Sequence, residues 1–414
     1  MSYDRVTSPT ELTRWTTRLT APTDSQRQPA ATAPSVLRNH FPQLDGLRAL
    51  AAVAVISEHF SRLEDWTHFP IGIFGLWLFF VLRGFLITGI LLRAKADAGG
   101  DGGQLRHAWR AFYARRILRI FPLYYTVLIG ALCLGLPGVR ASFGWNATHL
   151  ANVLEVTRGQ APGFGHFWSL SVEEQFYFLW PTIVLLAPRR LVYAIAAAMV
   201  FAAPVARRMM LSASDNMHLA RVVPPACLDG LGMGALLGLL RDGGGTSAAI
   251  RRWLGRVALG VGLTILAIIF ATGLYGIGWR LPFAARYSAY ALVAFWLIDR
   301  AADGFGGWTR AVLESPPLLY LGKISFGIYV LHLIVPEGIR WVEARTGLDL
   351  HFPAALGFGQ FAYVTAASVS LATVSWYVLE RPINDLKRFF PYIRRQARPI
   401  RGTTGASLDP VTRP

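Results

Sequence analysis

The chain has 414 residues, of which 53% are hydrophobic and only 16% are charged. Soluble domains carry about a quarter charged residues, so this composition argues against a soluble globular protein and for repeated membrane spans. The formal net charge is +17, but no basic face interleaved with stacking aromatics accompanies it, so basic loops beside anionic lipid explain it better than a nucleic-acid partner. The two cysteines, Cys133 and Cys227, lie in apolar segments and indicate packing rather than a disulfide or a metal site.

The two ends of the chain differ from its middle. Residues 1–40 are rich in Ser, Thr, Pro, Arg and Gln and have no apolar core for a signal peptide, so we expect a disordered cytoplasmic tail there. Residues 384–414 are basic and too short for a soluble domain, and we expect a second cytoplasmic tail. Residues 41–383 remain as one transmembrane domain.

The middle of the chain predicts an all-α integral membrane protein, with about ten transmembrane helices forming a bundle around a buried polar cavity. The expected spans are about 44–62, 71–92, 117–137, 167–187, 191–211, 223–240, 254–273, 281–299, 315–335 and 354–379. If both termini are cytoplasmic, the inner segments hold 28 basic residues and the outer segments hold 10. This asymmetry agrees with the positive-inside rule and favours cytoplasmic termini.

The first span carries Arg48 and His59, eleven residues apart in an otherwise apolar stretch. Eleven residues make about three helical turns, so both side chains fall on one face, roughly 16 Å apart along the axis. An arginine is costly inside a bilayer, and a histidine is suited to proton transfer near neutral pH. Two interpretations are open: the two residues reach opposite interfaces as anchors, or both line a functional cavity.

Three further arginines lie in or beside the next two spans. Arg83 stands well inside the second span and needs either a buried partner, such as an intramembrane glutamate, or a polar cavity. Arg116 and Arg119 lie on one helical face at the inner interface, shortly before Tyr124. Two guanidinium groups there suit a phosphate-bearing ligand, although positive-inside anchoring alone also explains them.

The fourth span carries Ser169 and two adjacent carboxylates, Glu173 and Glu174. Adjacent residues of a helix point about 100° apart, so at least one of the two carboxylates faces the bundle. A carboxylate in that place can orient a histidine or relay its protons, whereas an interfacial position is the simpler alternative.

The last two spans add four polar residues to this set. Tyr329 and His332 are one helical turn apart in the ninth span, and a structural role also fits a single histidine there. Glu380 closes the tenth span, where it can pair with an inner arginine. With odd spans running outward, the outer half holds His59, Glu173, Glu174 and His332, and the inner face holds Arg48, Arg116, Arg119 and Glu380. One end therefore resembles an anion site and the other a proton-transfer site.

In these residues the chain resembles the acyltransferase-3 family of polytopic membrane acyltransferases, over about residues 40–390. The family's arginine and histidine separated by ten residues match Arg48 and His59. Its Phe-Phe-x-Leu-Ser-Gly-Phe stretch matches 79–85, its Arg-x-x-Arg pair matches Arg116 and Arg119, and its Trp-Ser-Leu-Ser-Val-Glu-Glu-Gln-Phe-Tyr stretch matches 168–177. One position departs from the pattern, because the family usually has Ser where this chain has Arg83.

The resemblance implies an O-acyltransferase that moves an acyl group, most often acetyl, from cytoplasmic acyl-CoA to a hydroxyl of a carbohydrate or glycoside, which is lipid-linked in some members. We expect a multi-pass protein of the bacterial inner membrane, in contact with membrane lipids and without a metal or a nucleic-acid partner. His59 is the expected general base or acyl carrier, with Glu173 or Glu174 orienting it. Arg48, Arg83, Arg116, Arg119 and Tyr124 are the expected donor-binding residues, and Ser169, Tyr329, His332 and Glu380 complete the expected site.

Two other classes of function stay open. A transporter or flippase of a sugar-linked or acylated lipid would use the same residues as a proton relay and would turn over no acyl-CoA. A scaffold for an envelope complex would leave the buried charges unexplained.

Overall fold

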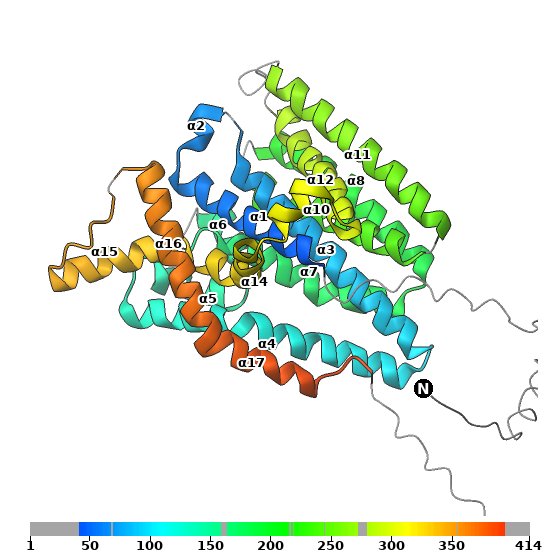
Figure 1. Ribbon diagram of the computed structural model, residues 1–414, viewed down its shortest axis with the longest axis horizontal. Coiled ribbons are helices and arrows are strands. Elements are labelled where there is room, and N and C mark those ends of the chain that lie inside the picture. The colour runs from blue at the N-terminus through cyan, green and yellow to red at the C-terminus, as the bar shows by residue number, and fades with distance from the viewer. Residues whose placement is uncertain are drawn as a thin grey trace, which may run out of the picture. The chain divides into compact units, whose positions relative to one another are not determined.

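The computed structural model describes residues 41–67, 69–158, 164–214, 217, 219–243, 245–271, 280–353 and 355–393. The expected N-terminal tail, residues 1–40, lies outside the described residues, as does 394–414 of the expected C-terminal tail. In the described part of the chain every regular element is a helix (Figure 1). Helices suit a membrane because each backbone amide finds its partner within the same segment.

The elements follow one another with short connections. They are α1 (Pro42–Phe60), α2 (Leu63–Thr67), α3 (Ile71–Ala98), α4 (Gly102–Leu134), α5 (Val139–Ala147), α6 (Ala151–Arg158), α7 (Phe167–Leu186), α8 (Arg189–Ser214), α9 (Leu219–Val222), α10 (Pro224–Asp242), α11 (Gly245–Ala271), α12 (Arg280–Asp303), α13 (Gly307–Leu313), α14 (Pro316–Leu331), α15 (Ile334–Thr346), α16 (Phe358–Ser375), a π-helical turn η1 (Trp376–Glu380), α17 (Arg381–Asp385) and a short 3-10 helix η2 (Leu386–Phe389).

The expected spans coincide with helices. In chain order they fall on α1, α3, the second half of α4, α7, α8, α10, α11, α12, α14, and α16 with η1. Among the described residues, six helices are long and apolar enough to cross a membrane, or seven if α14 and α15, bent by 56°, form one broken span. The protein is therefore an all-helical, multi-pass membrane protein, while the count of ten spans and the cytoplasmic termini stay predictions.

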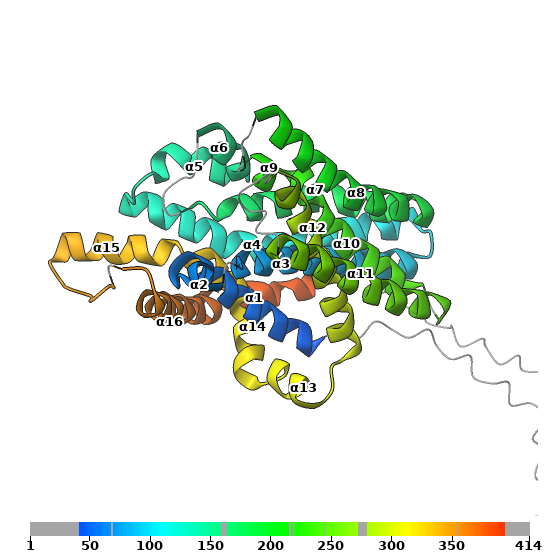
Figure 2. The same cartoon turned by 90° about the horizontal axis from the view of Figure 1, so that it is seen from above.

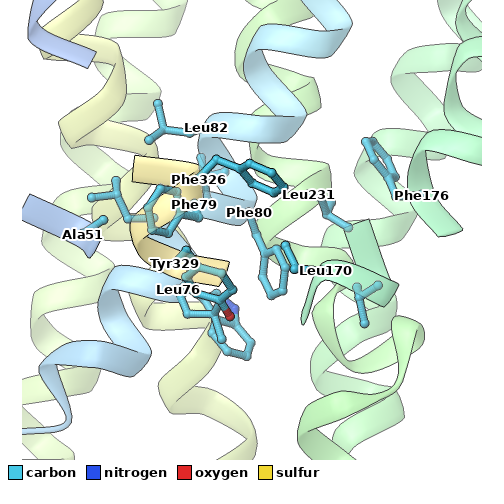
Figure 3. Close-up of a cluster of buried hydrophobic side chains, with 14 of the residues drawn as sticks. Ala51, Leu76, Phe79, Phe80, Leu82, Leu170, Phe176, Leu231, Phe326 and Tyr329 are labelled. Atoms are coloured by element: carbon cyan, nitrogen blue, oxygen red, sulfur yellow. The ribbon is translucent and has the colours of Figure 1, made fainter. Parts of the chain in front are cut away.

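Helix α3 is the most enclosed of these six candidate spans. Its apolar stretch is 78% buried, compared with 22% for that of α11, so α3 is central and α11 peripheral (Figures 1 and 2). Helix α3 packs against α1, α7, α10 and α12, and α1 packs in turn against α14. The side chains that fill these contacts include Phe79, Phe80 and Phe326, which Figure 3 shows close together with Tyr329.

Two glycines allow the central helices to approach very closely. A Cβ atom on Gly322 of α14 would lie 2.0 Å from the backbone oxygen of Asp45 in α1. A Cβ atom on Gly234 of α10 would likewise lie 2.0 Å from the backbone oxygen of Val81 in α3. Small residues at such crossings are a common feature of membrane helix packing, where close backbone approach replaces the hydrophobic driving force. Gly322 thus lets α1, which carries Arg48 and His59, lie directly against α14, which ends just before His332.

Buried ion pairs join the helices on the other side of α3. Arg207 of α8 is fully buried and lies 2.6 Å from the carboxylate of Asp229 in α10, which also accepts a hydrogen bond from Ser288 of α12. The guanidinium is held inside because Asp229, Ser288 and two backbone carbonyls together satisfy its donors.

Candidate active site

A cavity of about 600 Å³ opens between α1, α3, α4 and the C-terminal segment, and we call it the arginine cavity. Seven basic side chains line it, whereas only two acidic ones do. The basic residues are Arg48, Arg83, Arg93, Arg115, Arg116, Arg119 and Lys387, and the acidic ones are Asp45 and Asp97. Its size is in the usual range for small-molecule sites, and its charge suits a ligand with several phosphates.

Several contacts hold these cations in place. Arg48 donates a 2.6 Å hydrogen bond to Asp45, one turn earlier on α1. Arg116 lies over the ring of Tyr177, 4.9 Å from its centroid. Arg115 donates to the backbone oxygens of Lys387 and Phe390, which fastens the C-terminal segment to α4. The four arginines expected to bind the donor are thus brought into one cavity, and residues 384–393 of the expected tail pack against it.

A constriction of about 10 Å³ follows the arginine cavity. Its lining residues are Leu76, Phe79, Arg83, Leu170, Glu173, Ser325, Phe326 and Tyr329. Figure 3 shows five of them, Leu76, Phe79, Leu170, Phe326 and Tyr329, gathered where α3, α7 and α14 meet. Two of the polar lining residues form an ion pair, because Arg83 lies 3.1 Å from the Glu173 carboxylate. Arg83 also donates a hydrogen bond of 3.1 Å to the hydroxyl of Tyr177, which is not itself a lining residue.

A second cavity, of about 380 Å³, lies beyond the constriction, and we call it the histidine cavity. Its polar side chains are Glu58 and His59 of α1, His166 just before α7, Arg221 of α9 and Tyr329 of α14. The side chain of His59 is open to this space rather than buried. The constriction shares Leu76 and Tyr329 with the histidine cavity, and Arg83 and Ser325 with the arginine cavity. Helix α1 therefore presents Arg48 to the cavity on one side of the constriction and His59 to the cavity on the other.

Three histidine rings stand next to one another at the histidine cavity. The His59 and His332 ring centroids are 5.3 Å apart, and those of His332 and His166 are 4.7 Å apart. Nδ1 of His332 lies 2.6 Å from the Tyr329 backbone oxygen, so Nδ1 carries the hydrogen and Nε2 the lone pair. Nε2 of His166 lies 3.0 Å from the Val330 backbone oxygen, so its lone pair is on Nδ1.

These two lone pairs are unusual for a protein interior. His332 is fully buried and His166 is 4% exposed, yet neither lone-pair nitrogen has a hydrogen-bond partner within the described residues. Two other polar side chains next to these rings do have hydrogen-bond partners. The hydroxyls of Ser169 and Tyr329 lie 2.5 Å apart, and both lie within hydrogen-bond distance of the His166 backbone oxygen. The arrangement leaves two imidazole nitrogens near His59 whose lone pairs no described residue occupies.

The two adjacent glutamates point to different places, and neither lines the histidine cavity. Glu173 contacts Arg83 and Tyr177. Glu174 lines a separate cavity of about 480 Å³ together with Arg116 and His149. The structure therefore places His332 beside His59, where the sequence led us to expect a glutamate. The sequence shows that one carboxylate must face inward, but the rotation of α7 relative to α1 decides what it meets.

Two other expected residues lie apart from the two cavities. Tyr124 donates a 2.8 Å hydrogen bond to the backbone oxygen of Asn146 and stacks on His149, away from the arginine cavity. Glu380 is buried and accepts a hydrogen bond from Ser375 at 3.2 Å. Among the described residues, no group of three or more His, Cys, Asp or Glu side chains could hold a metal ion.

The structure also adds residues that the sequence did not single out. Arg93 and Arg115 join the arginine cavity, and His166 and Arg221 join the histidine cavity. His166 opens the same segment as Glu173, but only its packing against α14 reveals its neighbour. Arg221 falls in a short connection, where nothing in its local sequence distinguishes it from other outer arginines.

Comparison with known proteins shows the family of the chain. The chain matches the acyltransferase-3 family, described as an acyltransferase domain, over residues 41–380. It is 33% identical over 164 residues to the peptidoglycan O-acetyltransferase OatA of Listeria monocytogenes, covering 36% of this chain and 25% of that protein. It is 32% identical over 162 residues to YrhL of Bacillus subtilis, named as a candidate peptidoglycan O-acetyltransferase, covering 35% of this chain and 24% of that protein. The matched stretch thus spans about a quarter of the relatives' own length, and no solved structure matches the chain.

Proposed function

Because the chain belongs to the acyltransferase-3 family, we propose that it transfers an acetyl group from a cytoplasmic acyl-CoA to a hydroxyl of a carbohydrate. The observation that carries this proposal is the pair of neighbouring cavities, one with seven basic side chains and one containing His59, which share lining residues with the constriction between them. A phosphate-rich donor and a neutral hydroxyl acceptor need these two different environments.

The arginine cavity is the proposed donor site. Arg116 and Arg119, with Arg48 and Arg115 beside them, would hold the phosphates of the donor through charged hydrogen bonds. The flexible arm of the donor would carry the thioester towards the constriction. Because that space measures only about 10 Å³, the side chains of Phe79, Phe326 and Arg83 must shift before the acyl group reaches His59.

The chemical step is proposed to occur in the histidine cavity. His59 takes the proton from the acceptor hydroxyl as this oxygen attacks the thioester carbonyl. The new carbon–oxygen bond forms, the carbon–sulfur bond breaks, and the proton returns to the departing thiolate, which yields the ester and free CoA. His332 would accept the proton transiently from His59, since its lone-pair nitrogen has no hydrogen-bond partner within the described part of the chain.

The names of the relatives favour a cell-wall glycan as the acceptor, modified at the outer face of a bacterial cell membrane. The orientation deduced from loop charge supports this, because it places the arginine cavity on the cytoplasmic side and the histidine cavity on the outer side.

Replacement of His59 tests the proposal directly. We expect His59→Ala to reduce acetyl transfer from acetyl-CoA by at least about a hundredfold, the usual contribution of a general base, while thermal unfolding of the purified protein is unchanged. The assay measures both free CoA and the acetylated oligosaccharide.

An active His59→Ala enzyme would rule out the mechanism. Wild-type protein that moves a glycolipid across proteoliposomes without releasing CoA would instead identify a transporter.

A further inference from the structure

Arg221 is an unpaired cation inside the histidine cavity. Its guanidinium lies over the ring of Trp168, with 6.0 Å between its central carbon and the ring centroid. Among the described residues, no carboxylate lies within ion-pairing distance of it, and its buried Nε atom has no hydrogen-bond partner. The two arginines that are buried among the described residues contrast with it, since Arg207 and Arg251 each contact a carboxylate.

The acidic residues around Arg221 do not cancel its charge. Glu58 lines the same cavity, but its carboxylate accepts the backbone N–H of Gly72 at 2.9 Å and is held against α3. Glu155, on the short helix α6 outside the spans, is the other nearby acid, and burial raises its pKa to about 8 against the opposing effect of the Arg221 charge. Glu155 is therefore mostly neutral near pH 7, and Arg221 keeps its five donors and its full charge for a ligand.

We propose that the histidine cavity takes an acceptor that carries an anionic group, a carboxylate or a phosphate, and that Arg221 binds this group. A guanidinium matches both oxyanions through paired hydrogen bonds, and both are stronger partners than a neutral sugar hydroxyl. Because Arg221 and His59 line one cavity of about 380 Å³, the anionic group and the acylated hydroxyl must belong to the same sugar or to adjacent units. This inference rests on the proposed acetyl transfer and adds the chemical class of the acceptor.

Direct binding measurements test the inference without any catalytic turnover. The purified full-length protein in lipid nanodiscs is titrated with three probes: trigalacturonic acid, its neutral counterpart galactotriose, and glucose 1-phosphate. We expect the wild type to bind at least one charged probe about ten- to a hundredfold more tightly than galactotriose. A preference for trigalacturonic acid identifies a carboxylate as the group that is recognised, and a preference for glucose 1-phosphate identifies a phosphate.

Two variants assign the preference to one side chain. Arg221→Gln should abolish the difference between charged and neutral probes, and Arg221→Lys should retain part of it. Arg345→Gln is the matched control, because Arg345 is exposed on α15 and also lies over a tryptophan ring, 4.7 Å from the centroid of Trp341. It should keep the full preference.

Equal binding of all three probes by the wild type, or an undiminished preference in Arg221→Gln, would overturn the inference. If Arg221→Gln does not fold, the salt dependence of wild-type binding replaces it. Added salt should weaken the charged probe alone, and an unaffected Kd would count against the inference. A protein that binds the charged probe selectively but transfers no acetyl group would contradict the proposed function and leave this inference standing.

Discussion

Arg83 partly fills the constriction between the two cavities, and an ion pair holds its side chain there. It stands where the acyltransferase-3 pattern has serine, and its side chain lines the constriction between the two cavities. The ion pair with Glu173 is largely shielded from solvent, with side-chain exposures of 19% for Arg83 and 5% for Glu173. The arginine therefore closes the path at the position where a serine would leave it wider, and its charge is balanced by a glutamate that the family pattern already contains.

A double-mutant cycle tests this pairing. Removal of one partner from a buried ion pair costs about 3–5 kcal/mol, because the other charge is left uncompensated. We expect Arg83→Ser and Glu173→Gln each to lower the Tm, and the double variant to be clearly more stable than the sum of the single effects predicts. The exposed pair Arg340–Glu337 serves as the control and should show a coupling of at most about 1 kcal/mol. Additive effects at Arg83 and Glu173 would show that the pair is not coupled.

The proposed role of His332 as a transient proton acceptor leads to a separate prediction. If His332 holds a proton that His59 releases, His332→Gln should lower kcat by about ten- to a hundredfold, the usual effect of losing a group that supports a functional residue. The KM for acetyl-CoA should stay the same, because the proposed site for the donor phosphates is the arginine cavity. A change in KM and Tm with an unaltered kcat would instead indicate that His332 acts only in packing.

At the scale of the helices, the contact between α1 and α14 positions both ends of the site. It depends on Gly322, whose added Cβ would meet the backbone oxygen of Asp45 at 2.0 Å. Backbone cannot move aside as a flexible side chain can, so we expect Gly322→Ala to destabilise the protein by about 1–3 kcal/mol, the usual range for overpacking. Thermal unfolding in detergent measures the change.

Gly130→Ala is the matched control for that substitution. Gly130 also lies inside a helix, but an added Cβ would meet nothing within 4 Å, so alanine should be neutral or slightly stabilising there. Equal effects of the two substitutions would mean that the close crossing of α1 and α14 does not contribute to stability.

The sequence predicts the helices better than it predicts their partners. Apolar runs of about twenty residues locate the spans because the bilayer fixes their length. The gathering of Arg48, Arg116 and Arg119 also follows, since the inner ends of neighbouring spans lie close together. The rotation of a helix about its own axis, relative to its neighbours, leaves no such pattern in the sequence. For this reason Glu173 meets Arg83 rather than His59, and His166 meets His332, which lies 166 positions later in the sequence.

For the molecule as a whole, the path runs lengthwise through the bundle, and its polar residues are concentrated on a few helices. Helix α1 carries Asp45, Arg48 and Glu58 and is not among the six helices that are long and apolar enough to cross a membrane. Helix α7, which carries Glu173 and Glu174, is not among them either. Two helices of the site thus have a weaker membrane signal than α3 and α4, because the charged residues that face the bundle lower their hydropathy.

Glu155 gives the stability of the whole protein a defined pH dependence. Burial raises its pKa from 4.5 to about 8, so the folded state keeps a proton that the unfolded state has lost over this range. Stability falls with rising pH wherever the folded state binds more protons, so the contribution of Glu155 is lost between about pH 4.5 and 8 and is constant above. The loss is at most about 1.4 kcal/mol per pH unit.

Glu155→Gln removes this titration, so its Tm should increasingly exceed that of the wild type from pH 5 to pH 8. Unfolding curves of the two proteins across this range provide the measurement, and a Tm difference that does not change with pH would show that Glu155 is ionised in the folded state throughout.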